Sequence, residues 1–558
     1  MAFDGIITSA MVAELDSIIV DSRVEKIYLP NKNEIILSLR KNRENLKLLF
    51  SIDASNARFH ITNTLKENPA KPPQFCMVLR KHLQGAKLLK IAQYGLDRVI
   101  EFVFENIDEL GDISRKSLYV ELMGKYSNII LVNNTKKIID SMRHVDSTMS
   151  SIREVLPARD YILPTTLDRS TFIGMDYDHF LATLQVSLMT PTTKENDYAG
   201  LISNQFVGFS RLFVQNLLDF CNFENTFTNE NTRKMFTSIS ILLNNCNNRL
   251  VKLINIGKDY HIDLNDYSTS STLLSEFLDK FYNEKENKNI LHGYKQSLSR
   301  EVLNQKSKYD KNLKRVNEII AESKDMEKYK EYGELLSSNI YRMQSGLKEI
   351  EVENFFDNNN PIIIPLNESF SPSKNAQQYF KKYTKLKNSL MHANTQKEEY
   401  ENNLDYLENI LYQIDECENV NDVEEIRKEL IDEGYIHSSP SKKKKVQEVS
   451  LPHKYEMNGI EILVGKNNIQ NEKLTLKESK KTYTWLHTKN VHGSHVIIKS
   501  DEVPDDVLLY AAGLAVKHSQ GKDSSKIEVD YTLVKNVRKL PGGKPGKVTY
   551  TNYKTIVI

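Results

Sequence analysis

Apolar and polar positions alternate over much of the first 170 residues, in short runs separated by Pro and Asn turns. Alternation with a period of two is typical of strands that have one buried face. Helical spacing of apolar residues occurs at residues 11–19 and 74–83, and the second of these helices is bounded by Pro72-Pro73 and Gly85. The pattern therefore predicts a β-rich sandwich with a few helices. Its strands are expected at residues 23–29, 34–39, 87–94, 97–104, 117–122 and 128–133, and in a run that begins at Leu46.

From about residue 171 to residue 285 the strand pattern disappears. Within this region, the segment Phe206–Leu218 resembles the second half of a helix–hairpin–helix (HhH) motif. In that motif a glycine turn presents helix-terminal amides to a phosphate. A glycine between two helices is also ordinary turn chemistry, so both interpretations stay open.

Residues 286–435 carry the most regular pattern of the chain. Apolar residues recur in alternating steps of four and three over residues 379–414, where Lys397 is the one polar member, and an earlier run over 309–350 has the same rhythm. The proline-rich segment 361–372 between the runs cannot continue a helix. Two heptad runs around a break predict an antiparallel coiled-coil hairpin. At 1.5 Å per residue the earlier run alone would span roughly 60 Å, so we expect a reaching element, with a dimerisation coil as the alternative.

The last hundred residues combine short strands with two glycine-containing loops. Residues 483–498 hold the only tryptophan of the chain and three of its thirteen histidines, and residues 538–547 form a basic glycine-rich segment. Polar and aromatic residues beside a flexible basic loop suit a phosphate backbone. We therefore predict a nucleic-acid-binding domain here. Its candidate contact residues are Lys489, His492, Gly493, Ser494, His495, Arg538, Lys544 and Lys547.

Charge supports a local rather than a global interface. The chain has 75 basic and 74 acidic residues, so no overall positive field favours a polyanion. From residue 526 to the end, however, seven basic residues face two acidic ones, a net charge of +5. A basic patch on a neutral protein indicates that one face docks on nucleic acid. A length of 558 residues exceeds what one core serves, so several domains are expected.

Catalytic and metal-binding motifs are not found in the sequence. The four cysteines are scattered without CxxC spacing, and no carboxylate lies between His487, His492 and His495. We therefore expect no metal and no cofactor, and these histidines are interpreted as structural or hydrogen-bonding groups. No apolar run approaches membrane-spanning length, and no secretion signal is evident. The expected compartment is the cytoplasm, without membrane association.

Asp97 and Arg98 stand together after a turn that Gly95 permits. Neighbouring side chains on a strand point to opposite faces, so both can be exposed only in a turn or at the start of a strand. An exposed arginine there can bind a phosphate or a guanine edge, and an aspartate can accept from a base amino group. From the residues alone, a salt bridge within the turn is the simpler interpretation.

Several motifs, in the same order along the chain, resemble the NFACT family of ribosome quality-control proteins. Together they cover essentially the whole sequence. The resembling segments are Met1–Gly5, Pro73–Leu83, Leu96–Arg98, Glu121–Leu131, the heptad runs and Trp485–His495. The resemblance implies a multidomain α+β fold. Its expected parts are a β-rich NFACT-N domain at 1–172, a helical HhH-like domain at 173–285, a coiled-coil arm at 286–435, a basic linker at 436–450 and a C-terminal α/β NFACT-R domain at 451–558.

The same resemblance implies a function. Such a protein would bind a 50S ribosomal subunit that carries an obstructed peptidyl-tRNA, recruit alanyl-tRNA and direct mRNA-free C-terminal alanine tails. Its partners would include rRNA, the stalk-base proteins and a small RNA-binding quality-control protein of the RqcP type. The protein would not be an enzyme, because the ribosome forms the peptide bonds. Asp97 and Arg98 match the family's tRNA-contacting pair, while Glu121 and Asn128 match family-typical positions that have either a binding or a structural role.

The sequence departs from the family pattern at two positions, and rival functions remain. Thr484 stands where an aspartate is common, and His492 where a proline is common, which puts the fine geometry of that loop in doubt. The N-terminal domain also resembles DNA glycosylases, but Ala2 stands where their catalytic proline would be. A surface adhesin that binds fibronectin, the family's older label, and a tRNA- or DNA-binding module without a ribosome link are the alternatives.

Overall fold

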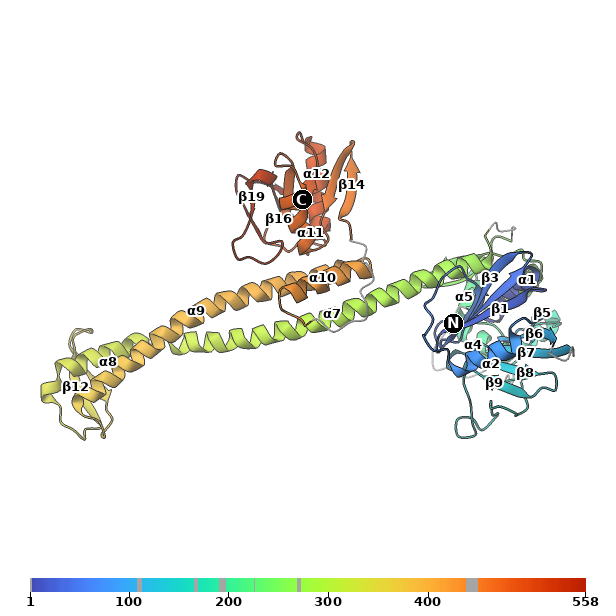
Figure 1. The fold of residues 1–558 in the computed structure, drawn as a ribbon, viewed down its shortest axis with the longest axis horizontal. Helices are drawn as coiled ribbons and strands as arrows, with labels where there is room; N and C mark the ends of the chain where they lie inside the picture. The colour runs from blue at the N-terminus through green and yellow to red at the C-terminus, as the bar shows by residue number, and fades with distance from the viewer. Residues whose placement is uncertain are drawn as a thin grey trace. The chain divides into compact units, whose positions relative to one another are not determined.

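The computed structural model places the chain in two compact units, residues 1–286 and residues 287–558. Figure 1 shows the secondary-structure elements of each unit. The predicted start of the arm at residue 286 falls at the boundary between the units. The structure describes residues 3–107, 113–164, 169–189, 197–224, 226–267, 272–437 and 450–558.

The first unit is built on one nine-stranded antiparallel sheet, ordered β4-β3-β2-β1-β5-β6-β7-β8-β9. The predicted strands all occur, because each alternating run buries one face. The strands are β1 (Arg23–Asn31), β2 (Glu34–Lys41), β3 (Glu44–Ser51), β4 (Arg58–Ile61), β5 (Lys87–Gln93), β6 (Val99–Ile107), β7 (Ile113–Glu121), β8 (Asn128–Asn133) and β9 (Ile138–Ser141).

The predicted sandwich is corrected to a single sheet that bends over itself. Strands β1 and β5 are joined in the ladder by only the pair Arg23–Lys87, which leaves a narrow connection between two halves. Phe50 of β3 packs on Phe102 of β6 with ring centroids 5.0 Å apart, although these strands are not neighbours. Alternation along each strand reports a buried face, but it does not distinguish one curved sheet from two stacked sheets.

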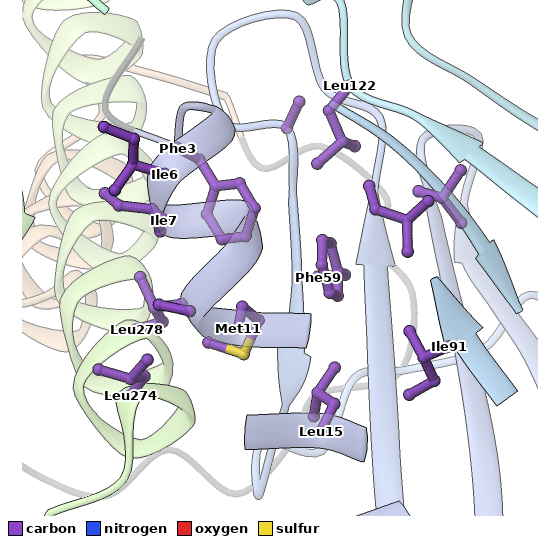
Figure 2. Close-up of a cluster of buried hydrophobic side chains, with 14 of the residues drawn as sticks. Phe3, Ile6, Ile7, Met11, Leu15, Phe59, Ile91, Leu122, Leu274 and Leu278 are labelled. Atoms are coloured by element: carbon purple, nitrogen blue, oxygen red, sulfur yellow. The ribbon is translucent and has the colours of Figure 1, made fainter. Parts of the chain in front are cut away.

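Helix α1 (Gly5–Ile19) lies in the core of the first unit. Its residues Ile7, Met11 and Leu15 are fully buried, and Figure 2 shows them between the strands and the start of α7. Side chains on several faces of the helix are covered, which is why its apolar residues exceed a single stripe. The second predicted helix occurs as α2 (Gln74–Leu83) with its predicted boundaries.

The helical region shares one apolar core with the sheet. Its helices are α3 (Tyr177–Met189), α4 (Tyr198–Gln205), α5 (Arg211–Phe220), α6 (Asn229–Asn247) and the beginning of α7 (Leu274–Glu322). A hairpin of β10 (Leu253–Ile256) and β11 (Asp259–Ile262) interrupts them and was not predicted, because strands of four residues leave too short an alternation to detect. The two predicted N-terminal domains therefore form one unit.

The second unit begins with the arm, which we define as residues 287–437. Helix α7 runs antiparallel to α9 (Pro372–Glu416), as shown by the ion pair Lys306–Glu408 and the ring contact Tyr309–Tyr400. Coiled-coil packing of these helices stays a prediction. An additional helix, α10 (Val420–Asp432), packs on α9.

The predicted continuous helix over 309–350 is wrong at its far end. Helix α7 ends at Glu322, and a separate helix, α8 (Met326–Ser338), follows. Strands β12 (Glu349–Asn354) and β13 (Asn360–Pro365) then form a hairpin in which Ile350 pairs with Ile364. The β-branched run before Pro365 favours an extended strand, and its pairing recruits Ile350 out of the helical rhythm.

The C-terminal domain, residues 450–558, contains a six-stranded sheet ordered β14-β15-β17-β16-β18-β21. All of its described pairs are antiparallel, so the domain is α+β rather than α/β. Helix α12 (Asp505–Lys517) covers one face, and α11 (Asn468–Lys473) lies near the other. The strands are β14 (His453–Met457), β15 (Ile460–Val464), β16 (Thr484–Thr488), β17 (Val496–Ile498), β18 (Glu528–Leu533) and β21 (Lys554–Val557), with a separate pair β19 (Val537–Lys539) and β20 (Val548–Tyr550).

Most of the predicted basic linker lies outside the described residues, which exclude 438–449. In the part of the chain that is described, no helix is both long and apolar enough to cross a membrane. The same residues contain no group of three or more His, Cys, Asp or Glu side chains placed to hold a metal ion.

Candidate nucleic-acid interface

The Asp97-Arg98 pair sits in a turn fixed by backbone hydrogen bonds. The Asp97 amide donates to the Tyr94 carbonyl at 3.0 Å, and Gln93 Nε2 donates to the Asp97 carbonyl at 2.9 Å. Gly95, which we predicted to permit a turn, has φ +57°, a left-handed conformation that favours glycine. The Arg98 amide donates to Asp97 Oδ1 at 2.7 Å. One oxygen of the Asp97 carboxylate therefore closes the turn, which makes Asp97 at least in part a structural residue.

The Arg98 side chain is half-buried among charged groups. Burial lowers the pKa of its guanidinium, and the negative charges of Asp4 and Asp97 oppose that shift. The exposed Arg169 adds a second cation near it. Arg169 comes from a segment about seventy residues further along the chain, so only the fold brings it to this place. The turn thus brings two guanidiniums together near the carboxylates of Asp4 and Asp97.

Two glycines lock the turn onto the helical region. The Gly5 amide donates to the Gly208 carbonyl at 2.9 Å. A Cβ on Gly5 would lie 1.9 Å from the Leu96 carbonyl oxygen, and a Cβ on Gly208 would lie 2.2 Å from the same atom. No side chain larger than hydrogen fits at either position without displacing backbone. The 94–98 turn, the start of α1 and the turn between α4 and α5 are therefore one assembly.

The Gly208 turn already presents its helix terminus to an anion of the chain itself. Ser210 caps α5, and its Oγ donates to Asp4 Oδ2 at 2.6 Å. His261 Nε2 lies 3.0 Å from the same oxygen. Asp4 in turn caps α1 by accepting from the amides of Ile6 and Ile7. This geometry supports an architectural task for the turn, and phosphate binding by an HhH motif stays a prediction.

Glu121 and Asn128 are both buried and hydrogen-bonded inside the first unit. Glu121 Oε1 accepts from Arg153 Nη1 at 2.8 Å and from the Tyr161 hydroxyl at 2.9 Å. Asn128 Nδ2 donates to the Arg143 carbonyl at 2.7 Å, and its Oδ1 accepts from the Arg143 amide at 2.9 Å. These contacts hold the segment after β9 against the sheet. They give the two residues a structural task that needs no bound RNA.

The aromatic motif of the C-terminal domain lies mostly in its interior. Trp485 on β16 is 0% exposed and contacts His495 edge-to-face with ring centroids 5.3 Å apart. His495 Nδ1 is 2.8 Å from Thr475 Oγ1, and burial lowers the pKa of His495 to about 3. Burial also lowers the pKa of His487. Neutral, enclosed imidazoles support the structural interpretation of these histidines.

The Gly-Ser step approaches its own chain. A Cβ on Gly493 would lie 2.8 Å from Thr488 Oγ1 and 2.9 Å from Ser519 Cβ. The Ser494 amide donates to the His518 carbonyl at 3.0 Å. The glycine that we predicted to admit a ligand therefore admits the end of α12. Gly493 and His495 are buried and contribute only to the wall of a cavity of about 940 Å³.

Three of the remaining predicted contact residues line the same cavity of about 940 Å³. Lys544, Lys547 and His492 line it, together with Trp485, whose indole Nε1 has no hydrogen-bond partner among the described residues. Arg538 lies exposed on β19 outside the lining. Lys489 pairs with Glu528 at 2.8 Å, also outside it. The prediction thus narrows to the cations of the 540–548 loop and their neighbours.

Acidic residues of α9 and α10 stand opposite these cations, which the sequence did not suggest. Lys544 Nζ lies 3.0 Å from Glu433 Oε2. Lys547 Nζ lies 3.7 Å from Asp405 Oδ2, and His492 Nε2 lies 3.4 Å from Asp405 Oδ1. In the described conformation the candidate RNA face of the domain is therefore neutralised from within the unit.

The tip of the arm, residues 340–366, carries a second surface that pattern reasoning missed. Tyr341 is 83% exposed, and Phe355 and Phe356 are about half exposed with their rings 4.4 Å apart. The first turns of α9 add Lys381, Lys382 and Lys385 to a neighbouring cavity of about 990 Å³. Exposed aromatic side chains beside lysines are typical of surfaces that bind protein or RNA. The heptad interpretation of this region hid them.

Two family models match the sequence. The model of the NFACT N-terminal and middle domains matches residues 4–449, and the model of the NFACT protein RNA binding domain matches residues 453–552. The chain belongs to the NFACT family. The first match ends at residue 449 and the second begins at residue 453 of this NFACT protein.

Relatives of this NFACT protein match it over its full length. It is 36% identical over 571 residues to the Rqc2 homolog RqcH of Bacillus subtilis (strain 168), covering 100% of the chain and 98% of that relative. The Rqc2 homolog RqcH of Streptococcus pneumoniae serotype 2 (strain D39 / NCTC 7466) is 33% identical over 560 residues, covering 100% and 97%. The human ribosome quality control complex subunit NEMF is 29% identical over 178 residues, covering 31% of the chain and 16% of that protein.

Solved structures resemble this NFACT protein in parts. The N-terminal part of the fibronectin/fibrinogen-binding protein from Streptococcus suis is 30% identical with a TM-score of 0.42, covering 51% of this chain and 100% of that one. The C-terminal part of the same protein is 31% identical with a TM-score of 0.38, covering 48% and 94%.

Proposed function

We propose that this protein is a ribosome quality-control factor. The observation that carries the proposal is its membership of the NFACT family over both matched domains, together with full-length relatives described as Rqc2 homologs. The human relative is described as a subunit of the ribosome quality control complex. The RNA-binding domain model and the basic loop at 538–547 support RNA as the direct ligand.

In this proposal the protein binds the 50S subunit that holds an obstructed peptidyl-tRNA. The tip of the arm makes one contact, with the stalk-base proteins and rRNA. Its exposed Tyr341, Phe355 and Phe356 supply apolar area, and the lysines at the start of α9 supply charge for phosphates. A small quality-control protein of the RqcP type joins the same particle.

The Asp97-Arg98 turn contacts a tRNA, which in the proposal is alanyl-tRNA. The ribosome forms the peptide bonds, while this protein holds the tRNA in place and so removes translational and rotational freedom before the reaction. Repeated rounds without mRNA produce C-terminal alanine tails that mark the stalled chain for degradation. The rigid, glycine-locked setting of the turn suits a positioning role, because a fixed cation loses little entropy on binding.

The test is sedimentation of a lysate that contains the tagged protein, followed by sequencing of the RNA that copurifies. We expect the protein to travel with 50S particles and to enrich alanine tRNA. A variant with Phe355→Ser and Phe356→Ser at the tip is expected to leave the 50S fraction, and Leu303→Ser, at an exposed site elsewhere on α7, is the control.

The alternatives predict different distributions. An adhesin would be cleaved by protease added to intact cells and would not follow 50S particles. A free tRNA- or DNA-binding module would copurify with nucleic acid in the light fractions of the gradient. Either result would overturn the ribosomal assignment.

A further inference from the structure

The junction between the arm and the C-terminal domain is polarised in charge. Among residues 287–437 and 450–558, every ion pair across this junction runs from a base on the C-terminal domain to an acid on the arm. Four lysines take part, together with two histidines that are cations only when protonated; burial lowers the pKa of His453 and so disfavours its charged form. The pairs are Lys466–Asp422, Lys522–Glu416, Lys544–Glu433, Lys547–Asp405, His492–Asp405 and His453–Glu418, with N–O distances of 3.7, 2.8, 3.0, 3.7, 3.4 and 4.0 Å.

Carboxylates of α10 also accept hydrogen bonds from side-chain amides at the start of α11. Glu425 Oε2 accepts from Asn467 Nδ2 at 2.8 Å and from Gln470 Nε2 at 2.9 Å. Glu429 Oε1 accepts from Asn468 Nδ2 at 2.9 Å. Hydrogen bonds to ionised acceptors are stronger than neutral ones. Burial raises the pKa of Glu429 to about 7, so this carboxyl is only partly ionised at neutral pH. The arm thus presents oxygens to amides and ammonium groups, as the oxygens of a phosphate backbone would.

Apolar packing contributes little to this junction. In the described part of the chain, the apolar cluster of the arm around Leu407 and Ile426 and the clusters of the C-terminal domain around Val496 and Trp485 share no residue. The ion pairs of Lys522, Lys544 and Lys547 are partly exposed, and exposed pairs each contribute at most about 1 kcal/mol and weaken with salt. Asp422, Glu429 and Asn468 are buried, so these three groups form the firmer part of the junction. A contact made of charges and amides is one that a competing polyanion can replace.

The lysines held by the arm are the lysines available to RNA. Lys544 and Lys547 belong to the glycine-rich loop that the sequence identified as basic, and both lie at the cavity of about 940 Å³. Lys466 and Lys522 extend the same face and come from separate loops. An RNA that reaches these four cations has to displace Asp405, Glu416, Asp422 and Glu433.

We propose that the acidic face of α9–α10 occupies the RNA-binding face of the C-terminal domain as an internal substitute for a phosphate backbone, and that RNA displaces it. The closed junction keeps a strongly basic face from binding nucleic acid indiscriminately, and binding of the correct RNA releases the domain from the arm. This inference rests on the proposed RNA-binding function and adds its regulation.

The test removes charge from the arm while leaving the RNA-binding lysines intact. In the full-length protein, Asp405→Asn, Glu416→Gln and Glu433→Gln are combined, which keeps side-chain size. The control combines Glu318→Gln, Glu322→Gln and Glu327→Gln, three exposed acids of the arm that take no part in the junction ion pairs. Affinity for an unmodified tRNA transcript is measured by fluorescence anisotropy at low salt.

We expect the junction variant to bind the transcript on the order of tenfold more tightly than the wild type, because three competing carboxylates are gone. The control variant loses the same formal charge, so it reports the general effect of charge on RNA affinity. Equal affinities for the junction and control variants would overturn the proposal.

A second measurement uses a carbodiimide, which joins an amine to a carboxylate in direct contact. The free wild-type protein is expected to give Lys522–Glu416 and Lys544–Glu433 cross-links, and saturating tRNA transcript is expected to suppress both. Cross-links that persist unchanged at saturating RNA would contradict the displacement. If no variant binds RNA but the cross-links form, the proposed RNA-binding function fails while the closed junction stands.

Discussion

The 94–98 turn and the 538–547 loop have similar sequence chemistry but opposite structural settings. Each places cations beside a glycine turn, and each was predicted to contact RNA. The turn is held by backbone and side-chain hydrogen bonds and by two glycines whose Cβ positions would clash with Leu96. The loop instead holds Lys544 and Lys547 in ion pairs with the arm.

This difference separates positioning from affinity. A cation on a rigid turn contributes precise geometry, because its place is fixed before RNA arrives. Cations on a loop that exchange one anion for another contribute salt-dependent attraction and can be switched off by an internal competitor. We infer that the first region decides where a tRNA sits, and the second decides whether RNA is bound at all.

The largest effect is expected from breaking the rigid region. Gly208→Ala places a Cβ 2.2 Å from the Leu96 carbonyl oxygen at a residue with φ +82°, so the turn, α1 and α5 cannot keep their packing. We expect a loss of at least about 3 kcal/mol in the free energy of unfolding of the first unit, measured by thermal or urea unfolding.

Gly293→Ala is the matched control for that change. Gly293 lies within α7, and a Cβ there meets no atom within 4 Å. Alanine should stabilise the helix by about 0.5–1 kcal/mol. Similar destabilisation by both substitutions would show that the close approach at Gly208 is not what holds the turn.

A change of intermediate size is expected at His495, and it tests whether the aromatic motif is interior. The folded pKa of about 3 lies below the ordinary value of 6.5, so the unfolded chain binds the extra proton first. The stability that this histidine contributes is present above pH 6.5 and is lost as the pH falls from 6.5 towards 3. Between pH 7 and pH 5 the loss is about 2 kcal/mol.

The measurement is urea unfolding followed by the fluorescence of Trp485, which packs on His495. In His495→Gln the slope of the unfolding free energy against pH should be smaller over this range, because the variant takes up one proton fewer on unfolding. An unchanged dependence would place His495 in contact with solvent, where it would again be a candidate for RNA binding.

The smallest effect is expected in the salt dependence of RNA binding by the 538–547 loop. Lys544→Gln with Lys547→Gln should reduce the slope of log affinity against log salt by about 1.5 for a tRNA transcript, since each lost phosphate contact removes 0.7–0.9. Lys499→Gln, which removes an exposed lysine paired with Glu461 instead of the arm, is the control. A slope that drops equally in both variants would mean that the loop has no special part in binding.

Pattern reasoning predicted the elements whose burial is decided locally. Each alternating run in residues 23–133 became a strand because its own residues supply one apolar face. The same reasoning failed where the secondary structure of a segment depends on pairing with another segment. Ile350 fits a heptad, yet it forms a strand because Ile364 pairs with it across a hairpin.

The candidate sites divide in the same way. Gly95 indicated a turn, and the turn exists. The proximity of Arg169 to Arg98 and of Glu433 to Lys544 joins segments that lie about 70 and 110 residues apart, and a single sequence carries no signal for such contacts. At the Gly493-Ser494 step the sequence predicted a close approach but the wrong partner. A glycine indicates that another group comes close, and here that group is the chain's own Thr488 and Ser519.

We propose that Arg98 positions a tRNA for tailing on the large subunit. The direct test supplies purified stalled 50S complexes with alanyl-tRNA and either the wild-type protein, Arg98→Ala, or Arg115→Ala as an exposed arginine control, and it scores alanine added to the stalled chain. We expect tails with the wild type and the control, and none with Arg98→Ala at an unchanged melting temperature. Normal tailing by Arg98→Ala, or no tailing by a wild-type protein that is bound to 50S, would contradict it.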